Sequence, residues 1–497
     1  IKSHSLLNKS IKTEYLSLQY INDKYLSSLS DIDFLVISDC NHPPCLDELK
    51  LLMPKAEIIT IGHYISHVYN VLCLSNYRPN NTSFLALDGF GDGLSGFCGK
   101  FNLEDLSILH EYPYDVSLGL LYTSATQHLG LGGFGSEGKM QGLASYGSYR
   151  EDYSLKNLIH IDGHLIEFEE ILAQKDDFGD QELYAVQALT TNKYFNKIIR
   201  KRFHDEDIEQ DHIDFAHTIQ KDIFNAIINV ANSIYDDNHK DLIFSGGLAQ
   251  NSTLINKLNL QTPFNRVLTS TSSSDRGNSL GALIAFMTKK GFRLEAIEPF
   301  LGYDICQDKS YKPMTEDTSN RLSNLIADDK IVALIEGRAE LGARALCNRS
   351  ILASPCHANM KDHLNRNVKH RELFRPFAPV LLENKVDKYF KSTKNNSDSK
   401  YMTRCVDALE LMINKYPAAV HVDGTSRIQL VDSKEKNRSI YKVLNTLGKV
   451  HGIDVLINTS FNDNGMPIVN TFDQALKAFR GMEIDYVVYG DEVLERQ

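Results

Sequence analysis

The 497-residue chain combines 42% hydrophobic with 24% charged residues, a balance typical of folded globular proteins. This length predicts two or three domains rather than one. The net charge of −11 argues against a nucleic-acid partner, because such binding normally needs a basic surface. No apolar run is long enough to cross a bilayer, and the eight cysteines form no CxxC pair, which fits a reducing cytoplasm. We therefore expect a cytoplasmic protein with neither nucleic acid nor membrane as a partner.

Short apolar segments alternate with amphipathic helices over residues 1–300, which we take as one domain. The segments that predict buried strands are 34–37, 58–61, 84–87 and 242–244. Helical spacing of apolar residues follows at 224–231 and 280–287. Such alternation predicts an α/β sheet covered by helices.

The pattern lapses near residue 300, and we expect a linker at 301–328, where prolines and polar residues gather. A second α/β domain is predicted at 329–497, with strands at 331–335, 454–457 and 486–489. Within it, the polar segment Lys391–Lys400 predicts a mobile loop.

A candidate metal site begins with His63 and His67, which lie one helical turn apart and could chelate one ion. Asp88 ends an apolar strand ahead of a glycine-rich turn, and Asp275 precedes a helix. Buried core histidines, a plain Asp-Gly turn and an N-cap are the ordinary alternatives. Two histidines with two carboxylates would suit a six-coordinate ion such as iron(II) or manganese, and the residues do not decide between the two.

Two glycine-containing segments are candidate phosphate loops. Gly246 and Gly247 follow a strand in SGGLAQN, which ends at Asn251, and a helix N-terminus after them would favour an anion. Lys139 lies between glycines in EGKMQGLA, which we expect to form a second loop. Either segment alone is more often a simple turn.

Residues 337–375 form the most basic stretch of this acidic chain. It contains the eight cations Arg338, Arg344, Arg349, Lys361, Arg366, Lys369, Arg371 and Arg375. A solvated basic face is the usual interpretation of such a run. Apolar residues interleave with these charges, however, and the polar motif NTSFN at 458–462 ends a later strand. We therefore predict an anion site built from both segments.

The order of the motifs resembles that of the NodU/TobZ-type O-carbamoyltransferases. The matching segments, between positions 62 and 469, are GHYISH, LALDGFGDG, SLGLLYTSAT, GSEGKMQGLASYG, SGGLAQN, SDRGNSLGA, GRAELGARALCNRSIL, VKHRELFRPFAPV, HVDGTSRIQLV and VLINTSFNDNGMPIV. The resemblance implies an actin/hexokinase-like (ASKHA, TsaD-like) N-terminal domain followed by a YrdC-like α/β C-terminal domain. It also implies conversion of ATP and carbamoyl phosphate into carbamoyl-adenylate, and carbamoyl transfer to an acceptor hydroxyl of a sugar or secondary metabolite.

The resemblance carries roles onto individual residues. The metal ligands are expected at His63, His67, Asp88 and Asp275, with iron(II) as the ion and Mg²⁺ as a candidate companion of ATP. Catalytic cations are expected at Lys369, Arg371, Arg344 and Arg375. Nucleotide contacts are expected at Ser460, Asn462, Gly246, Gly247, Asn251, Lys139 and Arg427. We expect a monomer or homodimer.

The chain departs from the family pattern at several positions. It begins with Ile1, about where the family's first edge segment ends, so we expect that edge to be missing and acceptor transfer to be affected. Tyr64, Cys347 and Met466 replace a usual histidine, glycine and glutamate, and we interpret these changes as tuning.

Three rival functions follow from the same motifs. A tRNA-modifying threonylcarbamoyl enzyme shares both domain types, although the acidic charge disfavours it. A hydrogenase maturation factor would carry CxxC zinc motifs, which are absent here. A transfer-deficient nucleotide-binding remnant is the third.

Overall fold

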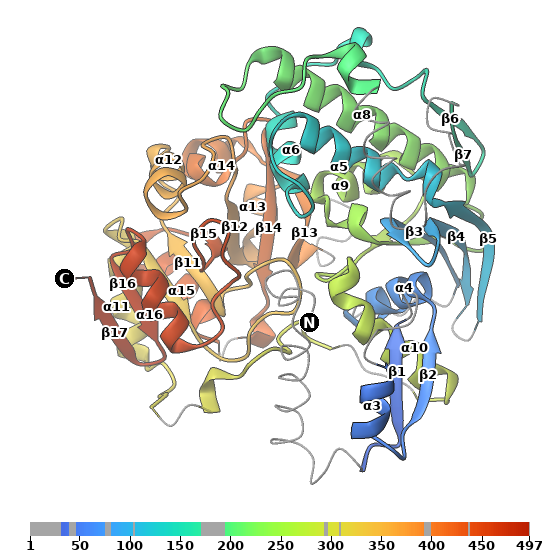
Figure 1. Ribbon diagram of the computed structural model, residues 1–497. Coiled ribbons are helices and arrows are strands. Elements are labelled where there is room, and N and C mark those ends of the chain that lie inside the picture. The colour runs from blue at the N-terminus through green and yellow to red at the C-terminus, as the bar shows by residue number, and fades with distance from the viewer. Residues whose placement is uncertain are drawn as a thin grey trace.

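The computed structural model describes residues 31–38, 46–74, 81–102, 105–169, 194–292, 297–307, 310–391, 399–435 and 438–496. Figure 1 shows two sheets in separate halves of the molecule, one blue to green and one orange to red. The first has the strand order β5-β4-β3-β8-β9, and the second has the order β13-β14-β12-β15-β11-β10-β16-β17. The predicted α/β fold with two sheet-based halves is confirmed.

The first sheet mixes an antiparallel meander with parallel strands. Strands β3, β4 and β5 pair antiparallel, and β8 and β9 continue the sheet in parallel beside β3. The strands are β3 (Asn81–Gly91), β4 (Leu94–Asn102), β5 (Asp105–Pro113), β8 (Asp241–Ser245) and β9 (Arg266–Leu268). Because side chains alternate along β3, Leu85 and Leu87 enter one core cluster while Phe84 and Ala86 enter another.

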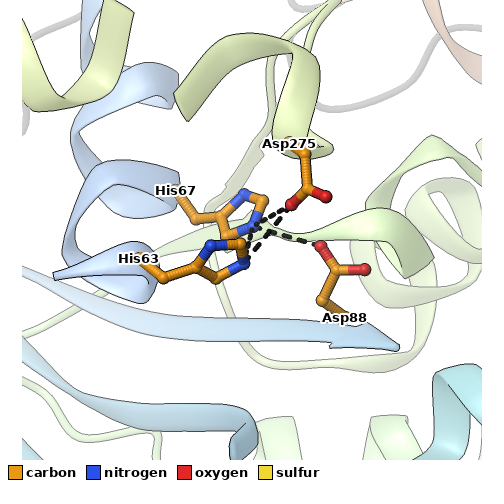
Figure 2. A group of neighbouring side chains, drawn as sticks. All are labelled: His63, His67, Asp88 and Asp275. Atoms are coloured by element: carbon orange, nitrogen blue, oxygen red, sulfur yellow. Dashed lines mark hydrogen bonds and ion pairs between the residues drawn. The ribbon is translucent and has the colours of Figure 1, made fainter. Parts of the chain in front are cut away.

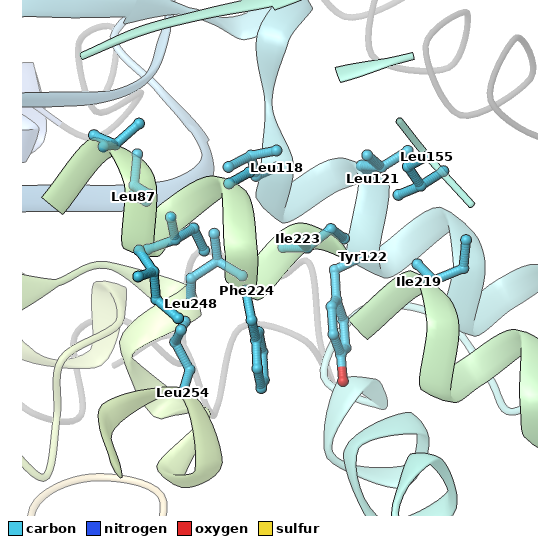
Figure 3. Close-up of a cluster of buried hydrophobic side chains, with 14 of the residues drawn as sticks. Leu87, Leu118, Leu121, Tyr122, Leu155, Ile219, Ile223, Phe224, Leu248 and Leu254 are labelled. Atoms are coloured by element: carbon cyan, nitrogen blue, oxygen red, sulfur yellow. The ribbon is translucent and has the colours of Figure 1, made fainter. Parts of the chain in front are cut away.

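Helices cover both faces of this sheet. Figure 3 shows Leu87 of β3, Leu121 of α5, Phe224 of α8 and Leu254 of α9 in one cluster of buried side chains. On the opposite face, α4 packs against α10. These helices are α4 (His63–Leu74), α5 (Leu118–His128), α8 (Gln210–Ser233), α9 (Ser252–Gln261) and α10 (Asn278–Lys289). The helices on the two faces of the sheet therefore support the ends of β3 and β8, where the chain leaves the sheet.

The first two predicted strands form their own small sheet. β1 (Phe34–Ser38) and β2 (Glu57–Ile61) pair in parallel beside α10, with the short helix α3 (Leu46–Leu52) between them in the chain. Most of their residues are partly exposed, and Phe34 is 40% exposed. The prediction that these strands are buried in the main sheet is therefore wrong, because a two-stranded sheet covered by a helix leaves the rest of its surface open. Another small hairpin joins β6 (Ile159–Asp162) to β7 (Leu165–Phe168).

The second sheet has eight strands of mixed direction. They are β10 (Val332–Ile335), β11 (Arg349–Ala353), β12 (Ala378–Leu382), β13 (Tyr401–Asp407), β14 (Thr425–Val431), β15 (Val455–Ser460), β16 (Tyr486–Tyr489) and β17 (Glu492–Glu495). The helices around it are α11 (Glu316–Ala327), α12 (Asn359–His363), α13 (Val386–Tyr389), α14 (Glu410–Lys415), α15 (Ser439–Thr446) and α16 (Phe472–Gly481). β15 lies between β11 and β12, so its carboxyl end opens near the middle of the sheet.

The expected linker contains a helix. α11 occupies Glu316–Ala327 and buries Leu322 and Ile326 against the second sheet. The linker prediction is therefore wrong for these residues. Their apolar residues are spaced for one face of a helix, but the polar residues around them favoured the prediction of a linker. Most of the predicted mobile loop Lys391–Lys400, together with residues 1–4, lies outside the described residues. No helix in the described part of the chain is both long and apolar enough to span a membrane.

Candidate functional site

Four residues from three separate segments converge beside the first sheet (Figure 2). His63 and His67 lie on the first turns of α4, Asp88 lies near the end of β3, and Asp275 begins a short turn before α10. One potential ligand atom from each residue lies within 4.8 Å of all the others. Both histidines are buried, at 1% and 0% exposure. The predicted four residues are therefore brought together.

The distances within this cluster suit a shared positive ion. The two Nε2 atoms of His63 and His67 are 3.1 Å apart. His67 Nε2 lies 3.1 Å from Asp88 Oδ2, and His63 Nε2 lies 3.3 Å from Asp275 Oδ1. One neutral imidazole can donate its N–H to the bare nitrogen of the other at this distance, and a metal ion between the two nitrogens could replace that proton.

A hydrogen bond at Nδ1 of His67 leaves Nε2 as the ring nitrogen that can bind a metal ion. Its Nδ1 lies 2.9 Å from the Ser273 carbonyl oxygen, which can only accept, so Nδ1 carries a proton and Nε2 faces the cluster. Burial alone would lower the pKa of His67, but Asp275 and Asp88 raise it to about 9. The cluster therefore attracts positive charge, and its nitrogen and oxygen donors fit a divalent ion.

The Gly246-Gly247 segment passes directly beside Asp88. A Cβ on Gly247 would lie 2.7 Å from Asp88 Oδ1, and one on Gly246, at φ +89°, would meet the Leu87 carbonyl oxygen. Asn251 caps α9, its side chain accepting a hydrogen bond from the Leu254 backbone N–H. The glycines therefore permit a close approach of two loops, while Asn251 is engaged as a helix cap.

A second site is a cavity of about 210 Å³ between the two sheet-bearing halves. We name it the arginine cavity, because its walls include Arg344, Arg371, Arg375 and Arg427. Residues of the first half also contribute, among them Gln141, Ser252 and Thr253. Gln141 lies on α6 (Glu137–Ala144), and Ser252 and Thr253 lie on α9, which contacts β13 of the second half (Figure 1).

The arginine cavity holds more positive charge than its surroundings neutralise. Burial, reinforced by the neighbouring guanidinium groups, lowers the pKa of Arg344 well below its ordinary value. Burial, then Arg375, lowers the pKa of Arg371 to about 9. Arg427 is shifted in the same direction by burial and by Arg375. Mutually repelling buried cations cost folding free energy and are stabilised when an anion enters.

Four residues with predicted roles lie close together, but only two of them line the cavity: Lys369, Arg371, Ser460 and Asn462. Lys369 is buried, and its Nζ donates to Asn462 Oδ1 at 2.8 Å and to the Ser460 carbonyl oxygen at 2.7 Å. Arg371 and Ser460 line the arginine cavity, whereas Lys369 and Asn462 do not. Lys369 thus ties the end of β15 to the segment after α12 and holds Ser460 at the wall.

The predicted second phosphate loop is wrong, because Glu137–Ala144 forms helix α6. Lys139 lies on it and makes an ion pair with Glu372 at 2.8 Å. Glu372 also lies 3.7 Å from Arg375. Gly142 lies on this helix and not in a turn; it faces Phe374 and Pro376 and, like Gly138, lines the arginine cavity.

Other cations of the basic stretch serve the fold. Arg349 is fully buried and donates to backbone carbonyl oxygens of five residues, Tyr303, Glu336, Gly337, Asn348 and Asn470. Lys361 donates to the Tyr146 hydroxyl. The sequence did not single out Cys405 or His421, which line the arginine cavity. Nothing in their spacing signals this position, although His421 lies in the quoted segment HVDGTSRIQLV.

One short turn contacts both sites. The turn η6 (Gly247–Gln250) begins beside Asp88, and its Gln250 carbonyl oxygen accepts a hydrogen bond from Arg344 at 3.4 Å. The metal-type cluster and the arginine cavity are therefore linked through this turn. The fold and these sites define a two-part α/β protein with an arginine-lined cavity, a candidate anion site, next to a candidate divalent-ion centre.

Comparison with known proteins identifies the family. Residues 11–284 match the model of the carbamoyltransferase N-terminus, and residues 323–496 match that of the carbamoyltransferase C-terminus. The chain belongs to the carbamoyltransferase family. This confirms the resemblance inferred from the motifs.

Individual relatives agree with this family. The nodulation protein NolNO of Sinorhizobium fredii is 30% identical over 458 residues, covering 89% of this chain and 64% of the relative. The chain thus spans less than two thirds of that protein. A 3'-hydroxymethylcephem-O-carbamoyltransferase of Amycolatopsis lactamdurans is 31% identical over 241 residues, covering 47% of this chain and 44% of the relative. A solved structure of full-length HypF in its phosphate- and nucleotide-bound form aligns with a TM-score of 0.35 at 14% identity, covering 59% of this chain and 43% of that one.

Proposed function

We propose that this protein is an O-carbamoyltransferase that activates carbamoyl phosphate with ATP in the arginine cavity and delivers the carbamoyl group to an acceptor hydroxyl. Activation consumes one water. Water cleaves carbamoyl phosphate into carbamate and phosphate, and a carbamate oxygen attacks the α-phosphorus of ATP. Pyrophosphate leaves and carbamoyl-adenylate remains. In the second step the acceptor oxygen attacks the carbamoyl carbon, AMP leaves and the hydroxyl proton is lost.

The observation that carries the proposal is the enclosure of four arginines in one cavity. Guanidinium groups present planar pairs of donors that match phosphate oxygens, and a preorganised set stabilises charge developing on them. Among the described residues, Glu372 is the one carboxylate that pairs with these arginines, at Arg375, and it also makes an ion pair with Lys139. Two phosphorylated substrates would supply the missing negative charge.

Delivery is proposed for the neighbouring cluster of His63, His67, Asp88 and Asp275. These four residues would hold a divalent ion, for which iron(II) is our expectation. When bound, that ion would supply Lewis acidity toward a carbonyl or phosphate oxygen. The chain's own contribution is to fix the ligands, since Ser273 orients His67 and Gly247 lets the loop approach Asp88. Because η6 contacts both sites, a reactive intermediate that passes between them would have less opportunity to react with water.

The test is pyrophosphate release from ATP, measured with and without carbamoyl phosphate. We expect release only when carbamoyl phosphate is present, and its loss in Ser460→Ala. Arg338→Met is the control, because Arg338 belongs to the same basic stretch but does not line the cavity, and within the described residues its side chain donates to the Leu301 and Gly302 carbonyl oxygens. Release that depended on threonine and bicarbonate would instead support a threonylcarbamoyl enzyme and overturn the proposal.

A further inference from the structure

Asn278 is a buried amide that faces three of the four residues of the metal-type cluster. It is the first residue of α10 and is 6% exposed. Its Nδ2 lies 3.3 Å from His63 Nδ1, 3.4 Å from His67 Nε2 and 3.4 Å from Asp275 Oδ1. The amide therefore reaches the cluster directly, although Asn278 supplies none of the four candidate ligand atoms.

The turn between β3 and β4 holds His63 in its place beside this amide. A Cβ on Gly91 would lie 2.5 Å from the His63 ring, so the glycine backbone packs directly against the ring. Asp92 Oδ2 accepts a hydrogen bond from the His63 backbone N–H at 2.8 Å. His63 Nε2 lies 3.1 Å from His67 Nε2, while Nδ1 faces Asn278. The ring therefore presents one nitrogen to the cluster and the other to the amide.

Ion binding by His63 would need an acceptor where Asn278 now offers a donor. A neutral imidazole that binds an ion through Nε2 carries its proton on Nδ1, and that N–H needs a partner. Asn278 Nδ2 can only donate, so it does not meet this need. Asn278 Oδ1 is buried and has no hydrogen-bond partner among the described residues, which costs free energy. A half-turn of the amide would exchange the two atoms and bring this acceptor to the His63 N–H.

We propose that Asn278 is a positioning residue of the metal centre, and that its amide turns on ion binding so that Oδ1 accepts a hydrogen bond from His63 Nδ1–H. This inference rests on the proposed function, because the turn has no cause unless the cluster holds an ion. The described orientation suits the ion-free protein, since Nδ2 faces the Asp275 carboxylate and ring nitrogens that can accept. With both Nε2 atoms engaged, Nδ2 would lose its acceptor at His67 and Oδ1 would gain a donor at His63.

Equilibrium dialysis with cobalt(II) measures the contribution of Asn278 without any turnover. Asn278→Ala removes the acceptor, so we expect cobalt(II) binding about 10- to 100-fold weaker than in the wild-type protein. Asn278→Asp keeps an acceptor of the same size and should bind cobalt(II) within about threefold of wild type or more tightly. If the amide acted only as a donor to Asp275, Asn278→Asp would bind as weakly as Asn278→Ala, because two carboxylates would then face each other.

A matched control and a spectroscopic measurement separate positioning from folding. Asn256 on α9 also has a buried Oδ1 without a partner among the described residues, but α9 packs on the opposite face of the first sheet from α4 and α10. Asn256→Ala should bind cobalt(II) like the wild-type protein. NMR of the histidine ring nitrogens in zinc-loaded wild-type protein should show a proton on His63 Nδ1, and His63→Gln identifies the signals. This measurement tests the idea even if Asn278→Ala fails to fold.

The outcomes distinguish the inference from the proposed function. Wild-type affinity kept in Asn278→Ala, equal losses in Asn278→Ala and Asn278→Asp, or a zinc-loaded His63 protonated at Nε2 would each overturn the inference. Cobalt(II) binding by the wild-type protein then leaves the metal site itself in place. Absence of that binding refutes the metal site of the proposed function, and the inference with it. Carbamoyl phosphate-dependent pyrophosphate release should be unaffected in Asn278→Ala, because activation is assigned to the arginine cavity.

Discussion

Replacing one arginine of the cavity should leave the ligand-free protein at least as stable as wild type while removing most of its affinity for anions. Arg371 is the best choice, because burial and Arg375 lower its pKa from its ordinary value to about 9. A pKa below that of the unfolded chain means that the charged form favours unfolding. This penalty is complete below about pH 9 and fades only as the pH rises toward the unfolded value.

The size of the effect follows from the contacts that Arg371 makes. The depressed pKa corresponds to a penalty of at most about 5 kcal/mol at neutral pH. Against it stand a hydrogen bond to Asn365 at 2.7 Å and a contact 4.8 Å above the Phe377 ring. These together contribute about 2 to 4 kcal/mol. Arg371→Met keeps much of the apolar length, so we expect an unchanged stability or a gain of about 1 to 2 kcal/mol.

Urea unfolding at pH 7.5, with and without pyrophosphate, measures both parts of this prediction. Wild-type protein should be stabilised by pyrophosphate, and Arg371→Met should lose most of that increment. A ligand-free Arg371→Met that is less stable than wild type by more than about 2 kcal/mol would show that Arg371 is a structural cation, and it would refute the strained-cavity argument.

Three further predictions test individual contacts. Lys139→Met removes the partner that, against the opposing effect of burial, lowers the pKa of Glu372. Stability above the ordinary pKa of that carboxyl should fall by about 0.5 to 1 kcal/mol, and the loss on acidification should become shallower in urea titrations between pH 7 and 3. Gly247→Ala should weaken binding of added iron(II) or manganese at least about tenfold in equilibrium dialysis, because the new Cβ would lie 2.7 Å from Asp88 Oδ1. Asp329→Gly should raise stability by about 0.5 to 1 kcal/mol in thermal unfolding, since exposed Asp329 has a φ of +59°; an equal or lower melting temperature would contradict this reasoning.

The metal-type cluster could be predicted because its signals are local. His63 and His67 have the spacing of one helical turn, and Asp88 ends an apolar strand before glycines. Asp275 comes from nearly two hundred residues after Asp88, and its position before a helix left a plain N-cap as the alternative until the resemblance to a known family assigned it to the metal site. The structure brings all four within 4.8 Å. Their role in metal binding stays a prediction.

The inward direction of the cations could not be predicted from the sequence. Arg349 and Arg371 lie in the same basic stretch, yet one is held by backbone carbonyl oxygens and the other lines the cavity. Burial of a charge depends on which acceptors the fold brings to it, and those come from distant segments. Likewise, Gly142 predicted a loop, but it lies on helix α6 and contacts Phe374, which comes from a distant segment.

The division of labour between the two sites is tested most directly by comparing Arg427→Met with Asp88→Ala. The measurement is pyrophosphate formed in a single turnover with ATP and carbamoyl phosphate. The account predicts that Arg427→Met abolishes this burst, whereas Asp88→Ala retains it and forms no carbamoylated product from an acceptor that the wild-type protein modifies. A burst lost equally in both variants, or retained in Arg427→Met, would contradict the assignment of activation to one pocket and delivery to the other.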